Sequence, residues 1–432
     1  MFDLIVRGGT VVTPSGAVSA DVGVLDGAVA AVEPELSGGA REDLDARGLH
    51  VFPGGLDPHV HFNEPGRTHW EGLETGTAAL AAGGFTAFFD MPLNSSPPVI
   101  DGAAFDAKLQ AARACARVDY GFWGGLVPGN LEHLEDLAER GAVGFKAFMS
   151  NSGIDEFSRA DDVTLYDGMA ECARLGKLVA VHAENDALTA RPAGSSARAF
   201  MASRPVVAEV EAIGRAIAFA EDTGCPLHIV HVSSARGVEL VAEARTRGVD
   251  VTCETCPHYL WLSQHDVETL GAVAKCAPPV RPDAERERLW QLVAGGAVDM
   301  LTSDHSPSPP ALKAGPFADA WGGIASCQTT LTLLLSEGNL ALEHAARLTA
   351  GGAAKRFGLP RKGRIEVGAD ADLALVDLDA EHLLGADELE YRHKLSPWIG
   401  RRLRARVTRT LLRGAEAWPE PKAAPRLLTP SL

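Results

Sequence analysis

The chain has 432 residues, 46% of them hydrophobic and 22% charged, which is ordinary for a globular protein with a large core. Its net charge of −17 argues against nucleic acid or an anionic membrane as a partner, because the long-range field repels phosphate. We expect a cytoplasmic protein with reduced thiols, since neither a signal peptide nor an apolar span stands out and the seven cysteines, including the lone Cys253-Glu254-Thr255-Cys256 pair that we interpret as structural, lack disulfide spacing.

Both ends of the chain have a β-type pattern. Residues 1–52 alternate short β-rich runs with glycine-containing turns, and Asp26-Gly27 between two such runs is a hairpin signal. The pattern returns near the other end, in runs at 364–367, 371–377 and 407–414. Each end is too short to bury both faces of a sheet alone, so we predict one composite β-sandwich domain from residues 1–52 and 362–432.

Residues 53–361 follow a different pattern, in which short apolar strands alternate with Ala- and Glu-rich segments of helical spacing. The predicted strands end near residues 61, 90, 124, 148, 182, 232, 253 and 304. Eight such repeats predict an α/β fold of the (β/α)8 TIM barrel type, and an open doubly wound sheet is the structural alternative.

Metal-ligating residue types gather at these predicted strand ends. His59 and His61 are two positions apart on a strand, which turns both imidazoles to one face. Because barrels of this kind carry their chemistry at the carboxyl ends of the strands, we expect these histidines to converge with others on a transition-metal site. The further candidates at strand ends are His182, His231 and Asp304.

Lys146 also stands at a predicted strand end. Burial among cations would lower the pKa of its ammonium and populate the free amine. A free amine can add carbon dioxide to give a carbamate, whose carboxylate could bridge two cations. A buried or salt-bridged lysine is the alternative.

Long segments of the sequence resemble the cyclic amidohydrolases: HVHFNEPGRTHWEGLETGT, DMPLNS, GFKAF, VHAEN, HVSS, ETCPHY, KCAPPVR and SDHSPSPP. The resemblance covers nearly the whole chain and implies a binuclear centre bridged by carboxylated Lys146. The implied ligands of the two divalent ions are His59, His61, Lys146, His182, His231 and Asp304. Zinc is the expected metal, with cobalt, manganese or iron as alternatives. The resemblance also implies a homotetramer.

The reaction that the resemblance implies is hydrolysis of a ring amide in a small-molecule substrate. Asp304 is the candidate to take the proton of the attacking water and deliver it to the leaving nitrogen. Expected substrate contacts are Asn63, Asn94 and the loop from Pro307 to Gly323, including Ser308 and Gly323 themselves. Ser326 is either a further contact or a helix cap.

The uncharged hydantoin ring of allantoin, opened to allantoate, is the substrate that these residues favour. Dihydroorotases carry an arginine at the position of Asn63 and a histidine at that of Ser308, and a buried carboxylate needs such cations. Ser308 also departs from the cysteine usual in allantoin-hydrolysing relatives. Dihydroorotase or hydantoinase activity on another cyclic amide is the alternative, as is a non-catalytic scaffold, although all six ligand positions are filled.

Overall fold

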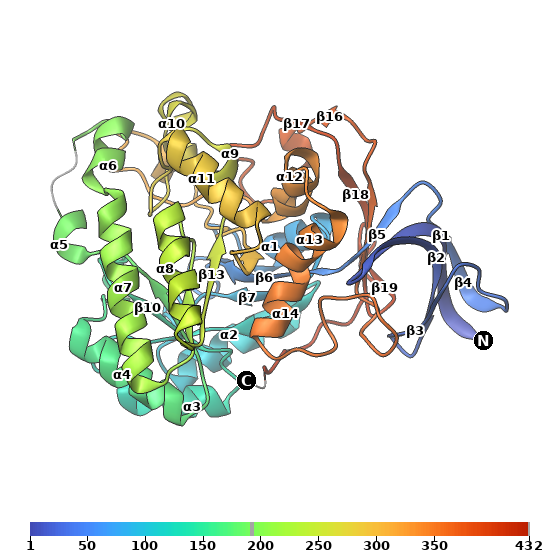
Figure 1. Cartoon of the computed structure of the whole chain (residues 1–432), viewed down its shortest axis with the longest axis horizontal. Coiled ribbons are helices and arrows are strands. Elements are labelled where there is room, and N and C mark those ends of the chain that lie inside the picture. Colours follow the sequence, from blue (N-terminus) through green and yellow to red (C-terminus); the bar gives the residue numbers. More distant parts are fainter. Residues whose placement is uncertain (191–193, 431–432) are drawn as a thin grey trace.

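The computed structural model describes residues 1–190 and 194–430, which form a barrel and a curved β-sheet beside it (Figure 1). The barrel strands are β6 (Gly55–Val60), β7 (Phe85–Asp90), β8 (Asp119–Phe122), β9 (Gly124–Gly125), β10 (Phe145–Phe148), β11 (Val179–His182), β12 (Leu227–Ile229), β13 (Val251–Thr255) and β14 (Met300–Leu301). Neighbouring strands pair in parallel, in the orders β6-β7-β8 and β9 to β14. Only Trp123 separates β8 from β9, and a parallel bridge between Val60 and His305 joins the first strand to the segment after the eighth. The predicted (β/α)8 barrel is confirmed.

Helices cover the outside of the barrel (Figure 1). The longer ones are α1 (Leu73–Ala82), α2 (Gly102–Cys115), α4 (Asp162–Arg174), α7 (Val206–Thr223), α8 (Ala235–Thr246), α11 (Asp283–Ala294) and α12 (Thr330–Glu337). Shorter ones are α3 (Leu134–Glu139), α5 (Asp186–Thr189), α6 (Ala197–Ser203), α9 (Pro257–Trp261), α10 (Gln264–Leu270), α13 (Leu342–Ala346) and α14 (Gly352–Arg356). Side-chain caps fix several starts, as where Asp101 accepts from the amide of Ala104 and Ser234 from that of Gly237.

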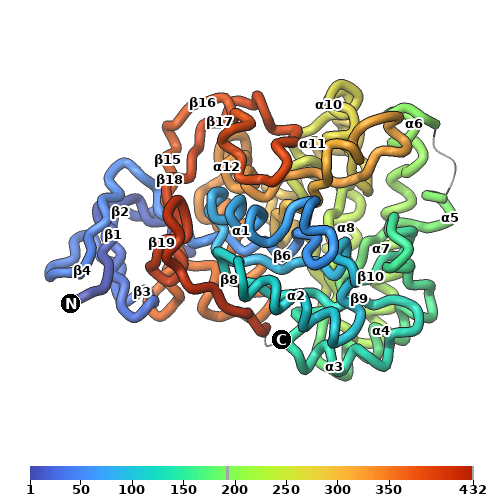
Figure 2. The backbone as a smooth tube through the Cα atoms, turned by 180° about the vertical axis from the view of Figure 1, so that it is seen from behind, coloured from blue at the N-terminus to red at the C-terminus, as the bar shows by residue number. Residues whose placement is uncertain are grey.

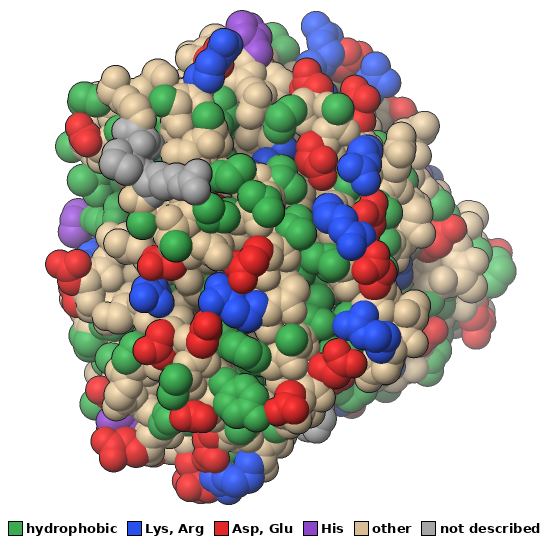
Figure 3. All heavy atoms as spheres, turned by 60° about the vertical axis from the view of Figure 1, so that its left-hand side comes forward, with side chains coloured by type: hydrophobic (Ala, Val, Ile, Leu, Met, Phe, Trp, Pro, Cys, Tyr) green, Lys and Arg blue, Asp and Glu red, His purple; other side chains and the backbone are tan. Residues whose placement is uncertain are grey.

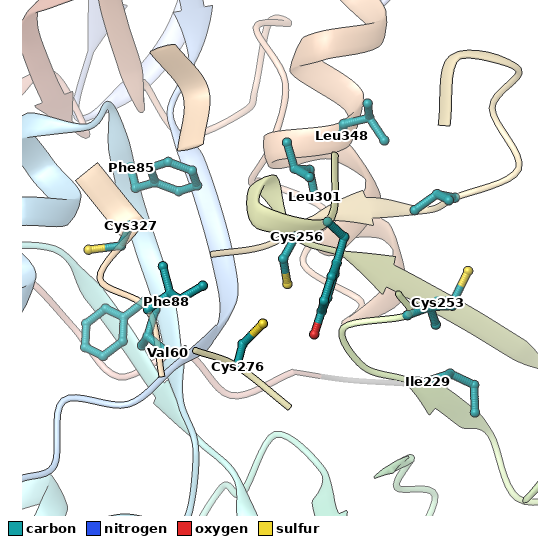
Figure 4. Close-up of a cluster of buried hydrophobic side chains, with 14 of the residues drawn as sticks. Val60, Phe85, Phe88, Ile229, Cys253, Cys256, Cys276, Leu301, Cys327 and Leu348 are labelled. Atoms are coloured by element: carbon teal, nitrogen blue, oxygen red, sulfur yellow. The ribbon is translucent and has the colours of Figure 1, made fainter. Parts of the chain in front are cut away.

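The barrel strands are buried on both faces, as parallel strands covered by helices should be. Every residue of β7, with the sequence FTAFFD, is buried. Figure 4 shows part of the resulting core, in which Val60, Phe88, Ile229 and Leu301 come from four different barrel strands. None of the helices within the described ranges is long and apolar enough to cross a membrane.

Strands from both ends of the chain form the second sheet. They are β1 (Phe2–Thr13), β2 (Gly16–Leu25), β3 (Ala28–Glu33), β4 (Ala40–Asp45), β5 (His50–Pro53), β15 (Leu373–Asp377), β18 (Arg406–Leu412) and β19 (Ala415–Trp418). Their order is β19-β18-β15-β5-β1-β2-β3, with β4 parallel to β1. The antiparallel pairing of β5 with β15 joins the two chain ends, as predicted. A separate pair, β16 (His382–Leu383) and β17 (Arg402–Leu403), lies at one corner of the molecule.

One predicted strand is wrong. Residues 364–367 form bends and turns, although Ile365 is buried in the core of the second sheet. Gly363 and Gly368 flank the segment with φ values of 75° and 92°, so the chain reverses there, and the amide of Asp370 donates to the carbonyl of Arg361. Ile365 is therefore buried although its backbone does not pair with a strand.

A buried ionic cluster joins the barrel to the second sheet. Lys362 Nζ lies 2.7 Å from Asp119 Oδ2 on β8, 2.6 Å from Asp372 Oδ2 and 3.1 Å from Asp370 Oδ2. The end of the chain returns to the same strand, where Arg426 and Leu428 hydrogen bond to the backbone of Tyr120 (Figure 2). Elsewhere on the surface, acidic and basic side chains are interspersed on the face seen in Figure 3.

Candidate metal centre

Three of the predicted ligands form a compact group at the carboxyl ends of the first and eighth strands. His59 is the penultimate residue of β6, His61 directly follows that strand, and Asp304 follows β14. One donor atom from each lies within 4.8 Å of the other two. The Nε2 atoms of His59 and His61 are 3.2 and 3.5 Å from Oδ1 of Asp304. Two imidazoles and one carboxylate at these distances are suited to chelating a divalent transition metal.

A histidine pair lies next to this group. His182 ends β11, and its Nδ1 is 2.9 Å from Nε2 of His231, which follows β12. The ring centroid of His231 is 5.4 Å from that of His59. The four predicted histidine ligands are therefore together, and their role as ligands stays a prediction.

Each of three histidines is oriented through its second ring nitrogen. Glu254 contacts Nδ1 of His59, the carbonyl of Leu93 is 2.7 Å from Nδ1 of His61, and Glu184 is 2.9 Å from Nε2 of His182. Such partners fix the tautomer, so that a lone pair on the other nitrogen faces the site. Sequence reasoning did not single out Glu254 or Glu184. The signal for Glu184 was its position two residues after His182 at a strand end.

Lys146 is completely buried, and Nζ has no hydrogen-bond partner among the residues that the structure describes. Burial lowers the pKa of this lysine to about 7. Nζ lies 5.1 Å from the ring centroid of Phe148, whose ring stacks on His182 at 4.6 Å. The amine lies close enough to His59, His182 and His231 to affect the pKa values of all three, and the carbamate on Lys146 stays a prediction.

Asp304 is held ionised. Although burial opposes this, His59 and His61 keep the pKa of the Asp304 carboxyl below its ordinary value. Its backbone has a φ of 42°, and His231 and Asn63 have φ values of 39° and 64°. Non-glycine residues seldom adopt this left-handed region, and such strain is typical of functional sites.

A cavity of about 930 Å³ opens over these residues. The residues that line it include His59, His61, His182, His231, Asp304, Asn94, Arg159, Arg204, Lys275 and Gly323. Of the four predicted substrate contacts, Asn94 and Gly323 line the cavity, whereas Asn63 and Ser308 are buried outside the described lining. Nδ2 of Asn94 donates to Oδ1 of Asn63 at 3.3 Å, so the buried Asn63 holds the side chain of Asn94 at the cavity.

Two lysines that sequence reasoning missed hold the loop after strand eight. Lys275 Nζ donates to the carbonyls of Phe317, Ala318 and Ala320 at 2.6–2.9 Å. Lys313 Nζ donates to the carbonyls of Trp321 and Gly323 at 2.9 and 2.6 Å. These hydrogen bonds hold the loop backbone in place beside the cavity.

Ser326 stands at the N-terminal cap position of the short helix Cys327–Thr329, but its side chain makes no capping hydrogen bond. Its hydroxyl accepts a hydrogen bond from Nε1 of Trp398 at 3.1 Å. It is fully buried and lies outside the described lining of the cavity. The residue therefore packs the C-terminal part of the chain against the segment that follows the loop.

Comparison with known proteins identifies relatives over the whole of this architecture. The profile of the Amidohydrolase family matches residues 50–416. The allantoinase of Rubrobacter xylanophilus is 59% identical over 425 residues, covering 96% of this chain and 93% of that protein. The allantoinase of Solibacter usitatus is 55% identical over 426 residues, with the same coverage of 96% and 93%. The solved structure of L-hydantoinase (dihydropyrimidinase) from Arthrobacter aurescens has a TM-score of 0.92 and 36% identity, and 96% of each chain is covered.

Proposed function

The chain belongs to the amidohydrolase family, and we propose that it hydrolyses the hydantoin ring of allantoin to allantoate. The observation that carries the proposal is the group of His59, His61 and Asp304 beside the His182–His231 pair at one cavity. Relatives named allantoinase at 59% and 55% identity support the choice of substrate.

The family and the His59–His61–Asp304 group indicate divalent metal binding. In the proposed centre the four histidines, Asp304 and carboxylated Lys146 would hold two divalent ions, for which zinc is the first candidate. When bound, such ions supply Lewis acidity, which lowers the pKa of water and polarises a carbonyl. Two facts support the bridge: the amine of Lys146 is buried, and it is unpaired within the described residues.

Asp304 carries the proton in this proposal. Its carboxylate accepts a proton from the attacking water and returns it to the ring nitrogen when the C–N bond breaks. Glu254 and the carbonyl of Leu93 hold the imidazoles of His59 and His61 in place, which keeps Oδ1 of Asp304 at a fixed distance from both rings. Asn94 and the loop backbone near Gly323 bind the ring and its ureido arm.

Within the described residues, the lysine and arginine side chains that line the cavity are already engaged, which favours an uncharged substrate. Arg204 pairs with Glu184, Arg159 lies 3.1 Å from Asp186, and the amino group of Lys275 donates to three loop carbonyls. To pair with one of these three cations, a substrate carboxylate such as that of dihydroorotate would have to break a contact that the cation already makes.

A substrate panel on metal-reconstituted protein tests the proposal, with allantoin, hydantoin, dihydrouracil and dihydroorotate side by side. We expect allantoin to be opened and dihydroorotate to have a kcat/KM at least ~10³-fold lower. Comparable values for the two compounds would overturn the assignment. A preference for hydantoin would support the second candidate, hydantoinase, which the likeness to the Arthrobacter enzyme favours.

We also propose that the protein is a homotetramer. Analytical ultracentrifugation can check this by measuring the mass of the assembly.

A further inference from the structure

His258 is a buried histidine that the proposed reaction does not use. It lies in α9, directly after strand β13, and is 0% exposed. Neither Nδ1 nor Nε2 has a hydrogen-bond partner among the residues that the structure describes. Leaving both polar atoms of a buried imidazole unsatisfied costs free energy, so the residue calls for a ligand that these residues do not provide.

Two further donor atoms lie beside this ring. One donor atom each from Cys256, His258 and Asp304 lies within 4.8 Å of the other two. Three atoms no further apart than this surround a point less than about 3 Å from each of them, and zinc takes sulfur at about 2.3 Å and nitrogen or oxygen at about 2.1 Å. Small side-chain movements would therefore complete a coordination sphere there.

The geometry points to an additional, inhibitory site for a thiophilic divalent ion, cadmium, formed by Cys256, His258 and Asp304. The bond from sulfur to the ion replaces the S–H bond of Cys256, and the proton leaves to solvent. The thiol makes this site selective, because sulfur favours zinc-like ions over manganese or magnesium, whereas the histidine and carboxylate donors of the main centre accept many metals.

Asp304 belongs to both groups, which explains why an ion here would inhibit. A cation bound to this carboxylate competes for the oxygen that accepts the proton of the attacking water. The claim that the ion inhibits hydrolysis therefore rests on the proposed function, whereas the claim that the ion binds does not. Asp304 also lines the cavity, so an ion can reach the site from the substrate side.

A second thiol provides the rival explanation. Cys276 lines the same cavity and belongs to the same buried cluster as Cys256 (Figure 4). It is not part of the group with His258 and Asp304. Exchanging each thiol separately distinguishes the two.

The experiment adds cadmium to the zinc-loaded protein. Three quantities are followed: bound cadmium and released zinc by equilibrium dialysis, the ultraviolet band of a cadmium–thiolate bond, and allantoin hydrolysis. We expect one additional cadmium per chain without zinc release, a thiolate band and loss of activity. Manganese at the same concentration should not inhibit.

Cys256→Ser should abolish the band and raise the inhibitory cadmium concentration at least ~10-fold while retaining activity with zinc alone. Its hydroxyl can use Thr302, whose Oγ1 is 3.8 Å from the native sulfur.

Cys253→Ser is the matched control, because it makes the same exchange at an equally buried thiol outside the group. His258→Gln should weaken cadmium binding as well, and it decides the question if Cys256→Ser does not fold. The proposal is overturned if Cys276→Ser alone removes the band, or if cadmium binds only by displacing zinc. If cadmium binds as expected but does not inhibit, the cadmium site stands and the proposed inhibition through Asp304 is wrong.

Discussion

Nδ1 of His182 lies 2.9 Å from Nε2 of His231, although 49 positions separate the two residues in the sequence. Adjacent parallel strands, β11 and β12, bring them together. The Nε2 atom of His182 is engaged by Glu184, so a lone pair on Nδ1 faces the second ring. If both rings are ligands, as predicted, a divalent cation would replace the hydrogen bond between them.

Metal removal is the first prediction. A strong chelator should abolish hydrolysis, and zinc should restore it with close to two ions per chain, as measured by elemental analysis. The melting temperature should fall on chelation as well, because an ion that binds only the folded state stabilises it. Full activity in protein shown to contain no metal would contradict the prediction.

The second prediction concerns Lys146. Lys146→Ala should lose both bound metal and activity, because the bridging carbamate supplies charge and geometry together. A short carboxylic acid such as formate should partly restore activity by occupying the vacated space. Lys355→Ala, at an exposed lysine, is the control and should change neither. A variant without Lys146 that kept both ions and full turnover would exclude the bridge.

The third prediction concerns the loop over the cavity. Lys313→Met should raise KM more than it lowers kcat, because the loop carbonyls of Trp321 and Gly323 lose their anchor while the candidate ligands are untouched. Gly323 has a φ of 143°, and a Cβ there would lie 2.2 Å from the carbonyl oxygen of Ser306, so the loop has little freedom to adapt. Lys355→Met serves as the control. An unchanged KM would show that the loop does not bind substrate.

The barrel could be predicted from sequence because its strands are short, apolar and regularly spaced, and because burial on both faces leaves a continuous hydrophobic run. The same signal failed at Ile365, which is buried without being in a strand. Burial and strand pairing are separate conditions, and only burial is visible in a local pattern.

The orienting groups around the centre were beyond local reasoning. Glu254 and His59 are 195 positions apart, and Lys275 and Ala320 are 45 apart. A glutamate or lysine that ends against a distant partner looks, in sequence, like any charged residue at an element end. Strand ends can be located from periodicity, whereas these contacts depend on how the loops fold over them.

The fourth prediction concerns stability. Lys362→Met should lower the free energy of unfolding by about 3–5 kcal/mol, because it leaves Asp119 and Asp372 buried without their cation. Chemical denaturation measures this, with Lys355→Met as the exposed control. Arg413 also pairs with Asp119, and this second cation limits how much the free energy of unfolding can fall. A change within error of the control would mean that Arg413 and Arg426 compensate fully.

The last prediction concerns proton transfer by Asp304. Asp304→Asn keeps the size and one oxygen donor of the side chain but removes its charge and basicity. General acid–base groups commonly contribute ~10²–10⁴-fold to rate, and this residue would serve both the water and the leaving nitrogen. We therefore expect kcat to fall by at least ~10²-fold while much of the metal is retained.

The metal content must be measured on the same sample, because His59 and His61 both contact Asp304 and a weakened centre would also lower kcat. Asp319→Asn is the matched control, since this exposed carboxylate lines the same cavity without belonging to either donor group. A fall in kcat at full metal content, absent in the control, separates proton transfer from ligation. An effect on KM alone would remove Asp304 from the chemical step and leave it as a ligand.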